Sequence, residues 1–171
     1  MKKTKNLTRY VTRTAIIAAL YTTLTLVSFA LGLSSGVIQL RLSEALCLLP
    51  LIMPEAVLGL FFGCLISNLI TGCVIWDIIF GSLATLIAAV ATRALAKCNV
   101  PLWLKSLPTV FSNAIIVPLV LMFAYGADGS YLFFFTTVGL GELVSATALG
   151  AGLFKWLCSN ESVCRAMGIK K

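Results

Sequence analysis

The chain has 171 residues, of which 60% are apolar and 11% are charged, and its mean hydropathy is +1.03. About 25% of the residues of an ordinary soluble domain are charged, so this composition cannot supply a charged shell around a core. It excludes a soluble enzyme, a soluble nucleic-acid-binding module and a disordered chain. A bilayer-spanning helix needs about 20 apolar residues, and six such helices fit this length. We therefore expect an all-α integral membrane protein with one domain and six transmembrane helices.

Breaks in the apolar pattern place the six expected helices. The first follows a basic N-terminus and has no small-residue cleavage site after it, so we interpret it as a retained span and not as a signal peptide. Pro50 and Pro54 divide the next apolar region, because proline lacks an amide donor and disfavours helix at the preceding residue. The predicted helices cover residues 13–33, 44–53, 56–74, 76–95, 106–125 and 131–157.

The basic residues predict an orientation. Of the 13 Lys and Arg residues, all except Arg41 fall near the two termini or in the 93–105 region. Because Lys and Arg accumulate in cytoplasmic loops, we expect both termini in the cytoplasm and Arg41 outside. This distribution explains the net charge of +7 without a nucleic-acid partner, and we expect the plasma membrane as the location. Aromatic rings that prefer the membrane interface stand at predicted helix ends, namely Trp76, Trp103, Tyr125, Tyr131 and Trp156.

Neither a metal nor a cofactor is expected. The chain has no histidine, and its 6 cysteines form no CxxC pair, so a zinc site or a haem attachment site is not indicated. We interpret the cysteines as small residues buried in helices. The lack of histidine also disfavours an integral-membrane enzyme. No Walker A motif occurs, so any ATP hydrolysis would have to come from another subunit.

Glu142 is the clearest polar interruption of an apolar segment. It lies about 16 Å into the last predicted helix, at ~1.5 Å per residue, and so near mid-membrane. Gly139 and Gly141 beside it let a ligand or another backbone approach closely. An ionisable group at this depth is costly and suggests a functional role. The alternative is a protonated carboxyl group bonded to a helix carbonyl.

Several other polar side chains fall in the outer half of the expected bundle, each with an alternative role. Asn68 could instead join two helices, Asp77 could favour a helix N-terminus, and Arg41 with Glu44 could form a surface ion pair or a cap. Asn113 lies deeper, and we interpret it as structural. The hypothesis is a cup open to the outside that suits a planar, N–H-rich, neutral or cationic ligand. Its residues would be Arg41, Glu44, Asn68, Trp76, Asp77 and Glu142.

Small residues indicate two close helix contacts. Gly59 and Gly63 have small-x-x-x-small spacing in the third predicted helix, and Ala15 and Ala19 have it near the cytoplasmic end of the first. Such faces let helices approach closely in lipid. Internal packing would explain one of them, and the Ala15–Ala19 face suggests an obligate partner subunit.

Four stretches of the chain resemble the QueT family, which comprises substrate-binding S-components of energy-coupling factor (ECF) transporters. They are IQLRLSEAL (38–46), GLFFGCLISN (59–68), WDIIFGSLAT (76–85) and GELVS (141–145). The resemblance covers residues from about 12 to 157. It implies six helices and a queuosine precursor as the substrate, which would be a 7-deazaguanine such as preQ0, preQ1 or queuine. It also implies a transmembrane coupling subunit and two ATPase subunits that dock on Ala15 and Ala19.

The expected site fits a base of this kind. Glu142 is our first choice, and Glu44 the second, to accept the paired N–H groups of a guanine-like edge. Asp77 or Glu44 would hold a ligand amine, Trp76 would stack on the ring and Asn68 would meet its carbonyl group. The alternative function is a stand-alone proton-coupled secondary transporter, or a channel, for a nucleobase-like solute. Glu142 would then be the proton-coupling carboxylate.

Overall fold

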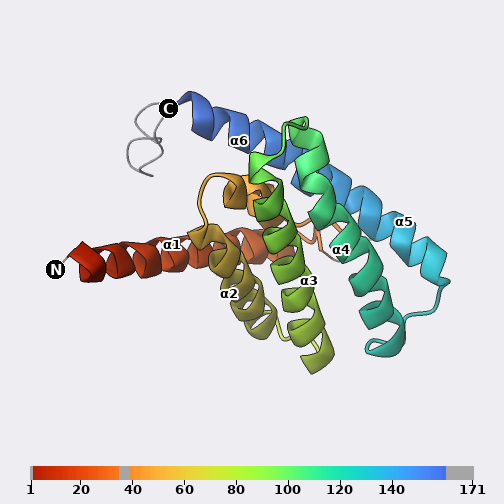
Figure 1. Cartoon of the computed structure of the whole chain (residues 1–171). Helices are drawn as coiled ribbons and strands as arrows, with labels where there is room; N and C mark the ends of the chain where they lie inside the picture. The colour runs from red at the N-terminus through yellow and green to blue at the C-terminus, as the bar shows by residue number, and fades with distance from the viewer. Residues whose placement is uncertain (1, 35–38, 161–171) are drawn as a thin grey trace.

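A computed structural model describes residues 2–34 and 39–160, with side chains from Leu7 onward. This part of the chain is helical, without strands, and confirms the all-α fold (Figure 1). The longer elements run antiparallel or obliquely beside one another, and a short 3-10 helix lies among them. In chain order the elements are α1 (Lys2–Ala30), η1 (Leu42–Leu51), α2 (Glu55–Ile70), α3 (Ile75–Ala94), η2 (Leu95–Lys97), α4 (Leu102–Phe123), α5 (Tyr131–Glu142), η3 (Leu143–Leu149) and α6 (Gly150–Ser159).

Four helical segments of the described chain are long and apolar enough to cross a membrane, which makes this a multi-pass membrane protein. The last one joins α5, the π-helix η3 and α6 into 29 residues. By contrast, η1 has 10 residues and α2 has 16. The six-span count and the cytoplasmic termini therefore stay predictions. The four segments are Leu7–Ala30, Ile75–Lys97, Leu102–Phe123 and Tyr131–Ser159.

Several observed boundaries differ from the predicted ones: η1 covers Leu42–Leu51 and not 44–53, α4 covers Leu102–Phe123 and not 106–125, and the differences at α1 and α2 have clear causes. α1 begins at Lys2, so the basic N-terminal segment is helical and projects from the bundle (Figure 1). α2 ends at Ile70 and not at residue 74, because Gly72 has a φ of 72°. A glycine in this left-handed conformation commonly ends a helix. The predicted break at Pro54 is confirmed, since Pro54 is the N-cap of α2.

Glycines in α2 bring α1 and α2 into close contact. A Cβ atom added at Gly63 would lie 2.6 Å from the Tyr21 Cβ atom, and one added at Gly59 would lie 2.8 Å from the Ile17 Cβ atom. Only hydrogen leaves room for the two helices at this distance. The glycine pair in the sequence therefore marks an internal contact.

The 3-10 helix η1 lies in the middle of the bundle. It packs against α1, α3, α6 and η3, and most of its residues are buried. At its end, the Arg93 guanidinium donates hydrogen bonds to the Pro50 carbonyl at 3.0 Å and the Leu51 carbonyl at 3.2 Å. η1 begins directly after Arg41, so this packing fixes where the Arg41 side chain leaves the backbone.

Candidate functional site

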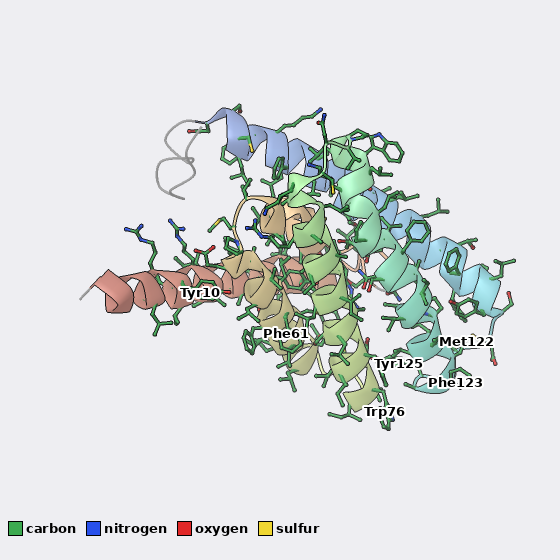
Figure 2. The ribbon with its side chains drawn as sticks, viewed as in Figure 1. Tyr10, Phe61, Trp76, Met122, Phe123 and Tyr125 are labelled. Carbon is green, nitrogen blue, oxygen red and sulfur yellow. The ribbon has the colours of Figure 1, made fainter. Side chains whose placement is uncertain are left out.

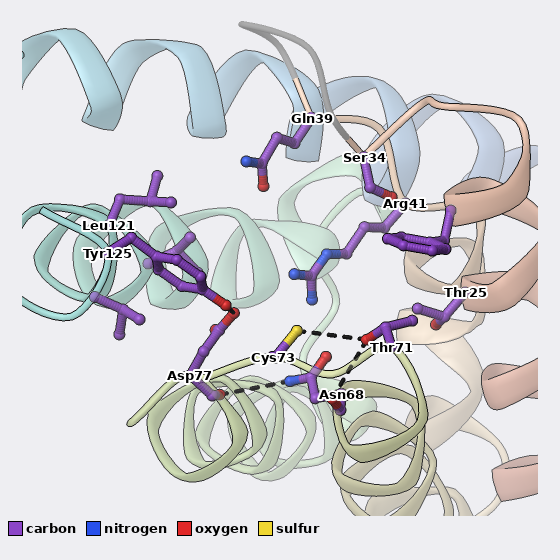
Figure 3. A pocket seen from close by; sticks show the side chains of 13 residues that line it. Thr25, Ser34, Gln39, Arg41, Asn68, Thr71, Cys73, Asp77, Leu121 and Tyr125 are labelled. Carbon is purple, nitrogen blue, oxygen red and sulfur yellow. Dashed lines mark hydrogen bonds between the residues drawn. The ribbon is translucent and has the colours of Figure 1, made fainter. Parts of the chain in front are cut away.

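A polar pocket of about 290 Å³ lies where α1, α2, α3 and α4 meet the segment before η1 (Figure 3). A cavity of about 150 Å³ holds a benzene ring, so this pocket has room for a fused two-ring base. Apolar residues of α4 form one side. The polar side chains that line it include Thr25, Gln39, Arg41, Asn68, Thr71, Asp77 and Tyr125.

Arg41 is the positive group of this pocket. Its guanidinium points toward the pocket centre (Figure 3). The backbone around it is fixed, because the Leu42 N–H donates to the Ser28 hydroxyl at 2.9 Å and the Leu40 N–H to the Leu33 carbonyl at 2.9 Å. The guanidinium itself has neither a hydrogen bond nor an ion pair among the residues the structure describes. Since arginine stays charged in proteins, the pocket contains a cation with unused N–H donors.

Asp77 provides a carboxylate acceptor on the α3 side of the pocket. It is 7% exposed and stands in the first turn of α3. The Tyr125 hydroxyl donates to Asp77 Oδ2 at 3.0 Å and accepts from the Val74 N–H at 3.2 Å. Partial burial, together with the Asp77 carboxylate, raises the pKa of the Tyr125 phenol above its usual value, so this hydroxyl stays a donor at neutral pH. Tyr125 therefore holds one carboxyl oxygen and leaves Oδ1 without its hydroxyl; Oδ1 lies on the Gly81 side, 3.2 Å from the place that a Cβ atom at Gly81 would take.

Asn68 lines the pocket and also joins two helices. Its amide nitrogen donates to the Asp77 backbone carbonyl at 3.5 Å and to the Cys64 sulfur at 3.7 Å. The sequence left helix joining and ligand contact open as alternatives. The geometry is compatible with both roles, because the amide nitrogen bonds within the protein while the side chain borders the pocket.

Glu142 lies in a separate, much smaller cavity of about 10 Å³. Asn113, interpreted from the sequence as structural, donates to Glu142 Oε1 at 2.9 Å, and Glu142 Oε2 is buried without a partner among the described residues. The cavity has room for about one water molecule. Gln39 and Arg41 line both this cavity and the pocket. These two side chains therefore stand between Glu142 and the open space.

Backbone packing holds the segment of Gln39 and Arg41 between the pocket and the Glu142 cavity. A Cβ atom at Gly141 would lie 2.1 Å from the Gln39 carbonyl oxygen, so glycine lets the segment before η1 rest directly on α5. Immediately after Glu142 the helix changes to the π-helix η3. π-Helical turns are rare and frequently occur at functional sites.

Two residues of the expected cup do not line the pocket. Glu44 is 3% exposed and accepts a hydrogen bond from the Tyr21 hydroxyl inside the core. Trp76 is 54% exposed, stacks on Phe80 with ring centroids 6.0 Å apart, and lines an apolar groove between α3 and α4 (Figure 2). Fewer of the six expected residues therefore line the pocket. Arg41, Asn68 and Asp77 share the pocket, Glu142 lies behind it, and Glu44 and Trp76 point elsewhere.

Tyr125 and Gln39 line the pocket but were not predicted from the sequence. Tyr125 is the last residue of a predicted span, where a membrane-interface role accounted for it, and Gln39 is an uncharged residue of a loop. Neither has a sequence signal that separates it from such ordinary roles. The residues that the structure describes contain no group of three or more His, Cys, Asp or Glu side chains that could hold a metal ion.

Comparison with known proteins identifies the family. The model of the QueT transporter family matches residues 11–159. A protein of Lactococcus lactis subsp. cremoris (strain MG1363) named queuosine precursor transporter QueT is 37% identical over 87 residues, which cover 51% of this chain and 50% of that relative. The match thus spans about half the length of the curated relative. No solved structure matches the chain. With most of its length matched, from the first half of α1 to the end of α6, this chain belongs to the QueT transporter family.

Proposed function

We propose that this chain is the substrate-binding S-component of an ECF-type ATP-driven importer in the plasma membrane, and that it takes up a queuosine precursor. The substrate would be a 7-deazaguanine such as preQ0, preQ1 or queuine. The observation that carries the proposal is a polar pocket, large enough for a two-ring base, within an apolar helical protein of the QueT transporter family. The name of the Lactococcus relative supports the choice of substrate.

The proposed orientation places the pocket outside and both termini in the cytoplasm. Asp77 stands at the start of α3 and Arg93 in its last turn, about 24 Å apart at ~1.5 Å per residue. Because basic residues favour the cytoplasmic side, a cytoplasmic Arg93 puts Asp77 and its pocket on the outer side. η1 and α2 would then be the second and third spans, both shorter than a hydrocarbon core of about 30 Å.

The proposed partners are a transmembrane coupling subunit and two ATPase subunits, which would dock on Ala15 and Ala19. Both alanines are exposed on α1, whereas Ala18 is buried against α2. This exposure leaves a small-residue face free for another helix.

Uptake by proteoliposomes tests the assignment. Vesicles that contain the chain alone and vesicles that contain the chain with the coupling subunit and both ATPases are loaded with ATP and given radiolabelled preQ0, preQ1 or queuine outside. We expect uptake only with the full assembly and ATP. The alternative, a stand-alone proton-coupled transporter or channel, predicts uptake by the chain alone. Uptake of that kind would contradict the proposal.

Tryptophan substitutions test the docking face. Ala15→Trp and Ala19→Trp should retain ligand binding in detergent but abolish ATP-dependent uptake, because a large ring blocks close helix approach. Ala30→Trp is the matched control, since Ala30 is an exposed alanine at the other end of α1. Normal assembly and transport by the Ala15 and Ala19 variants would show that docking occurs elsewhere.

A further inference from the structure

Two side chains of opposite charge line the pocket without a hydrogen bond between them. The guanidinium of Arg41 and the carboxylate of Asp77 both border the same space of about 290 Å³, yet they form no ion pair. Among the described residues an ion pair forms elsewhere, between Arg13 and Glu55 at 3.3 Å. The pocket therefore has N–H donors on one wall and a carboxylate acceptor on another, with empty space between them (Figure 3).

The surrounding contacts hold these two groups apart. The Tyr125 hydroxyl occupies Asp77 Oδ2, and the Asn68 amide binds the Asp77 backbone carbonyl, so the start of α3 cannot easily move toward Arg41. On the other wall, the hydrogen bond from the Leu42 N–H to Ser28 fixes the backbone next to Arg41. Unpaired charges inside a membrane protein are costly. A ligand that bonds to both would remove that cost.

We propose, building on the proposed function, that this pocket recognises the cyclic amide of a neutral oxo-heterocycle. Arg41 donates to the ring carbonyl oxygen, and Asp77 accepts the adjacent ring N–H. A lactam places one acceptor directly beside one donor, which is the complement of these two side chains. Arg41 and Asp77 carry opposite charges, so these two side chains by themselves give no preference for an ionised ring. This assignment makes Asp77, and not Glu142, the residue that reads the base.

The Glu142 cavity does not offer the same recognition. Its volume of about 10 Å³ admits no ring, and Asn113 already bonds Glu142 Oε1. Gln39 and Arg41 separate it from the pocket. Gln39 and Arg41 border both spaces, and Asp77 but not Glu142 lines the larger one.

The test compares a lactam with its deoxo analogue. 7-Cyano-7-deazaguanine is titrated into the purified chain in detergent beside its 6-deoxo analogue, which lacks both the carbonyl oxygen and the adjacent N–H. Guanine and 2-aminopurine, which differ in the same way, form a second pair. Sites built to bond a polar group strongly reject analogues without it, so we expect the wild type to prefer the lactam at least about 100-fold.

Substitution of Arg41 identifies the donor. Arg41→Met should reduce this preference by about tenfold or more, since one charge-assisted bond is lost. Arg41→Lys keeps the charge without the planar fork and should show an intermediate preference. It also provides a second test if the methionine variant does not fold. Arg9→Met, at an exposed arginine outside the pocket, is the matched control and should keep the wild-type ratio.

Three outcomes would overturn the proposal. They are equal wild-type affinity for lactam and deoxo analogue, full preference retained in both Arg41 variants, and no binding of either lactam. The two ligand pairs separate this proposal from the proposed function. Binding of guanine with the expected preference, but not of 7-cyano-7-deazaguanine, would support lactam recognition and contradict the proposed substrate. Equal binding of 7-cyano-7-deazaguanine and its deoxo analogue would support the proposed substrate and contradict lactam recognition.

Discussion

Asp77 and Glu142 are two buried acids on either side of the segment that carries Gln39 and Arg41, and their surroundings differ. Asp77 borders about 290 Å³ of open space, and Tyr125 holds one of its oxygens. Glu142 borders about 10 Å³, and Asn113 holds one of its oxygens. Burial marks both acids as unusual, since each is 7% exposed. The space beside the free oxygen distinguishes the acid that can meet a ligand.

The segment between the two acids matters as much as the acids themselves. Gln39 and Arg41 line the pocket on one side and the small cavity on the other. This wall is held by a close backbone contact with Gly141. A change that moves the wall should therefore merge or distort both spaces, whereas a change at one acid should affect its own side alone.

The largest effect is expected from Gly141→Ala, which would displace the segment that separates the pocket from the Glu142 cavity. The new Cβ atom would lie 2.1 Å from the Gln39 carbonyl oxygen, and this backbone atom cannot rotate away. We expect a loss of about 1–3 kcal/mol in stability, as for other overpacked sites, together with weaker ligand binding because Arg41 is displaced. Thermal unfolding in detergent and ligand titration measure the two effects.

The control for this change is Gly152→Ala in α6. A Cβ atom at Gly152 meets nothing within 4 Å, so the free energy of unfolding should stay within about 0.5 kcal/mol of the wild type. Equal Tm values for the two alanine variants and the wild type would contradict the close contact at Gly141.

A smaller effect is expected from Tyr125→Phe, which would remove the hydroxyl group that holds Asp77 beside the larger pocket. Asp77 Oδ2 would lose its donor, and the Val74 N–H would lose its acceptor. A net hydrogen bond is worth about 1 kcal/mol, so the Kd should rise roughly fivefold. Tyr131→Phe is the matched control, because the Tyr131 hydroxyl donates to the Ile115 carbonyl outside the pocket. Unchanged affinity in Tyr125→Phe would show that Tyr125 does not position Asp77 for ligand binding.

The same pair of proteins gives a pH test. Burial and the neighbouring Asp77 carboxylate raise the pKa of the Tyr125 phenol above its usual value, and the hydroxyl is therefore protonated at all pH values below that raised pKa. The ratio of the Kd values of Tyr125→Phe and wild type should stay constant between about pH 6 and 9, below the usual tyrosine pKa of ~10. A ratio that falls toward one within this range would mean that the phenol ionises there.

The smallest effect is expected from Trp76→Ala. Trp76 lines the apolar groove on the outer face of α3 and α4, apart from the polar pocket. Its removal should change the Kd by less than about twofold. A tenfold loss of affinity, in a variant that remains monodisperse, would return Trp76 to the ligand site as the sequence suggested.

Much of the helical layout could be predicted from the sequence, because long apolar segments end at recognisable residues. α3 begins and ends within a residue of the predicted range 76–95, and the break at Pro54 lies where proline chemistry predicts it. The 3-10 form of η1 could not be predicted. It depends on packing against α1, α3, α6 and η3, and these contacts join segments that are distant in sequence.

The polar and charged residues of the site could be predicted from the sequence, but the volumes of the cavities beside them could not. Arg41, Asn68 and Asp77 are polar residues within or beside apolar segments, and the structure brings them together. The size of the cavity beside Glu142 depends on Asn113 and on the approach of the Gln39 carbonyl to α5. Neither contact follows from spacing along the chain, so the sequence alone ranked Glu142 above Asp77.

The most direct measurement is a side-by-side titration of Asp77→Asn and Glu142→Gln with 7-cyano-7-deazaguanine in detergent. In Asp77→Asn the amide carbonyl can still accept from Tyr125, which turns an NH₂ group toward the ligand N–H. We therefore predict a Kd about 10- to 100-fold higher than that of the wild type. In Glu142→Gln the amide carbonyl can still accept from Asn113, and the Kd should change by less than about twofold. The reverse order, with Glu142→Gln the weaker binder and Asp77→Asn near the wild type, would contradict the account.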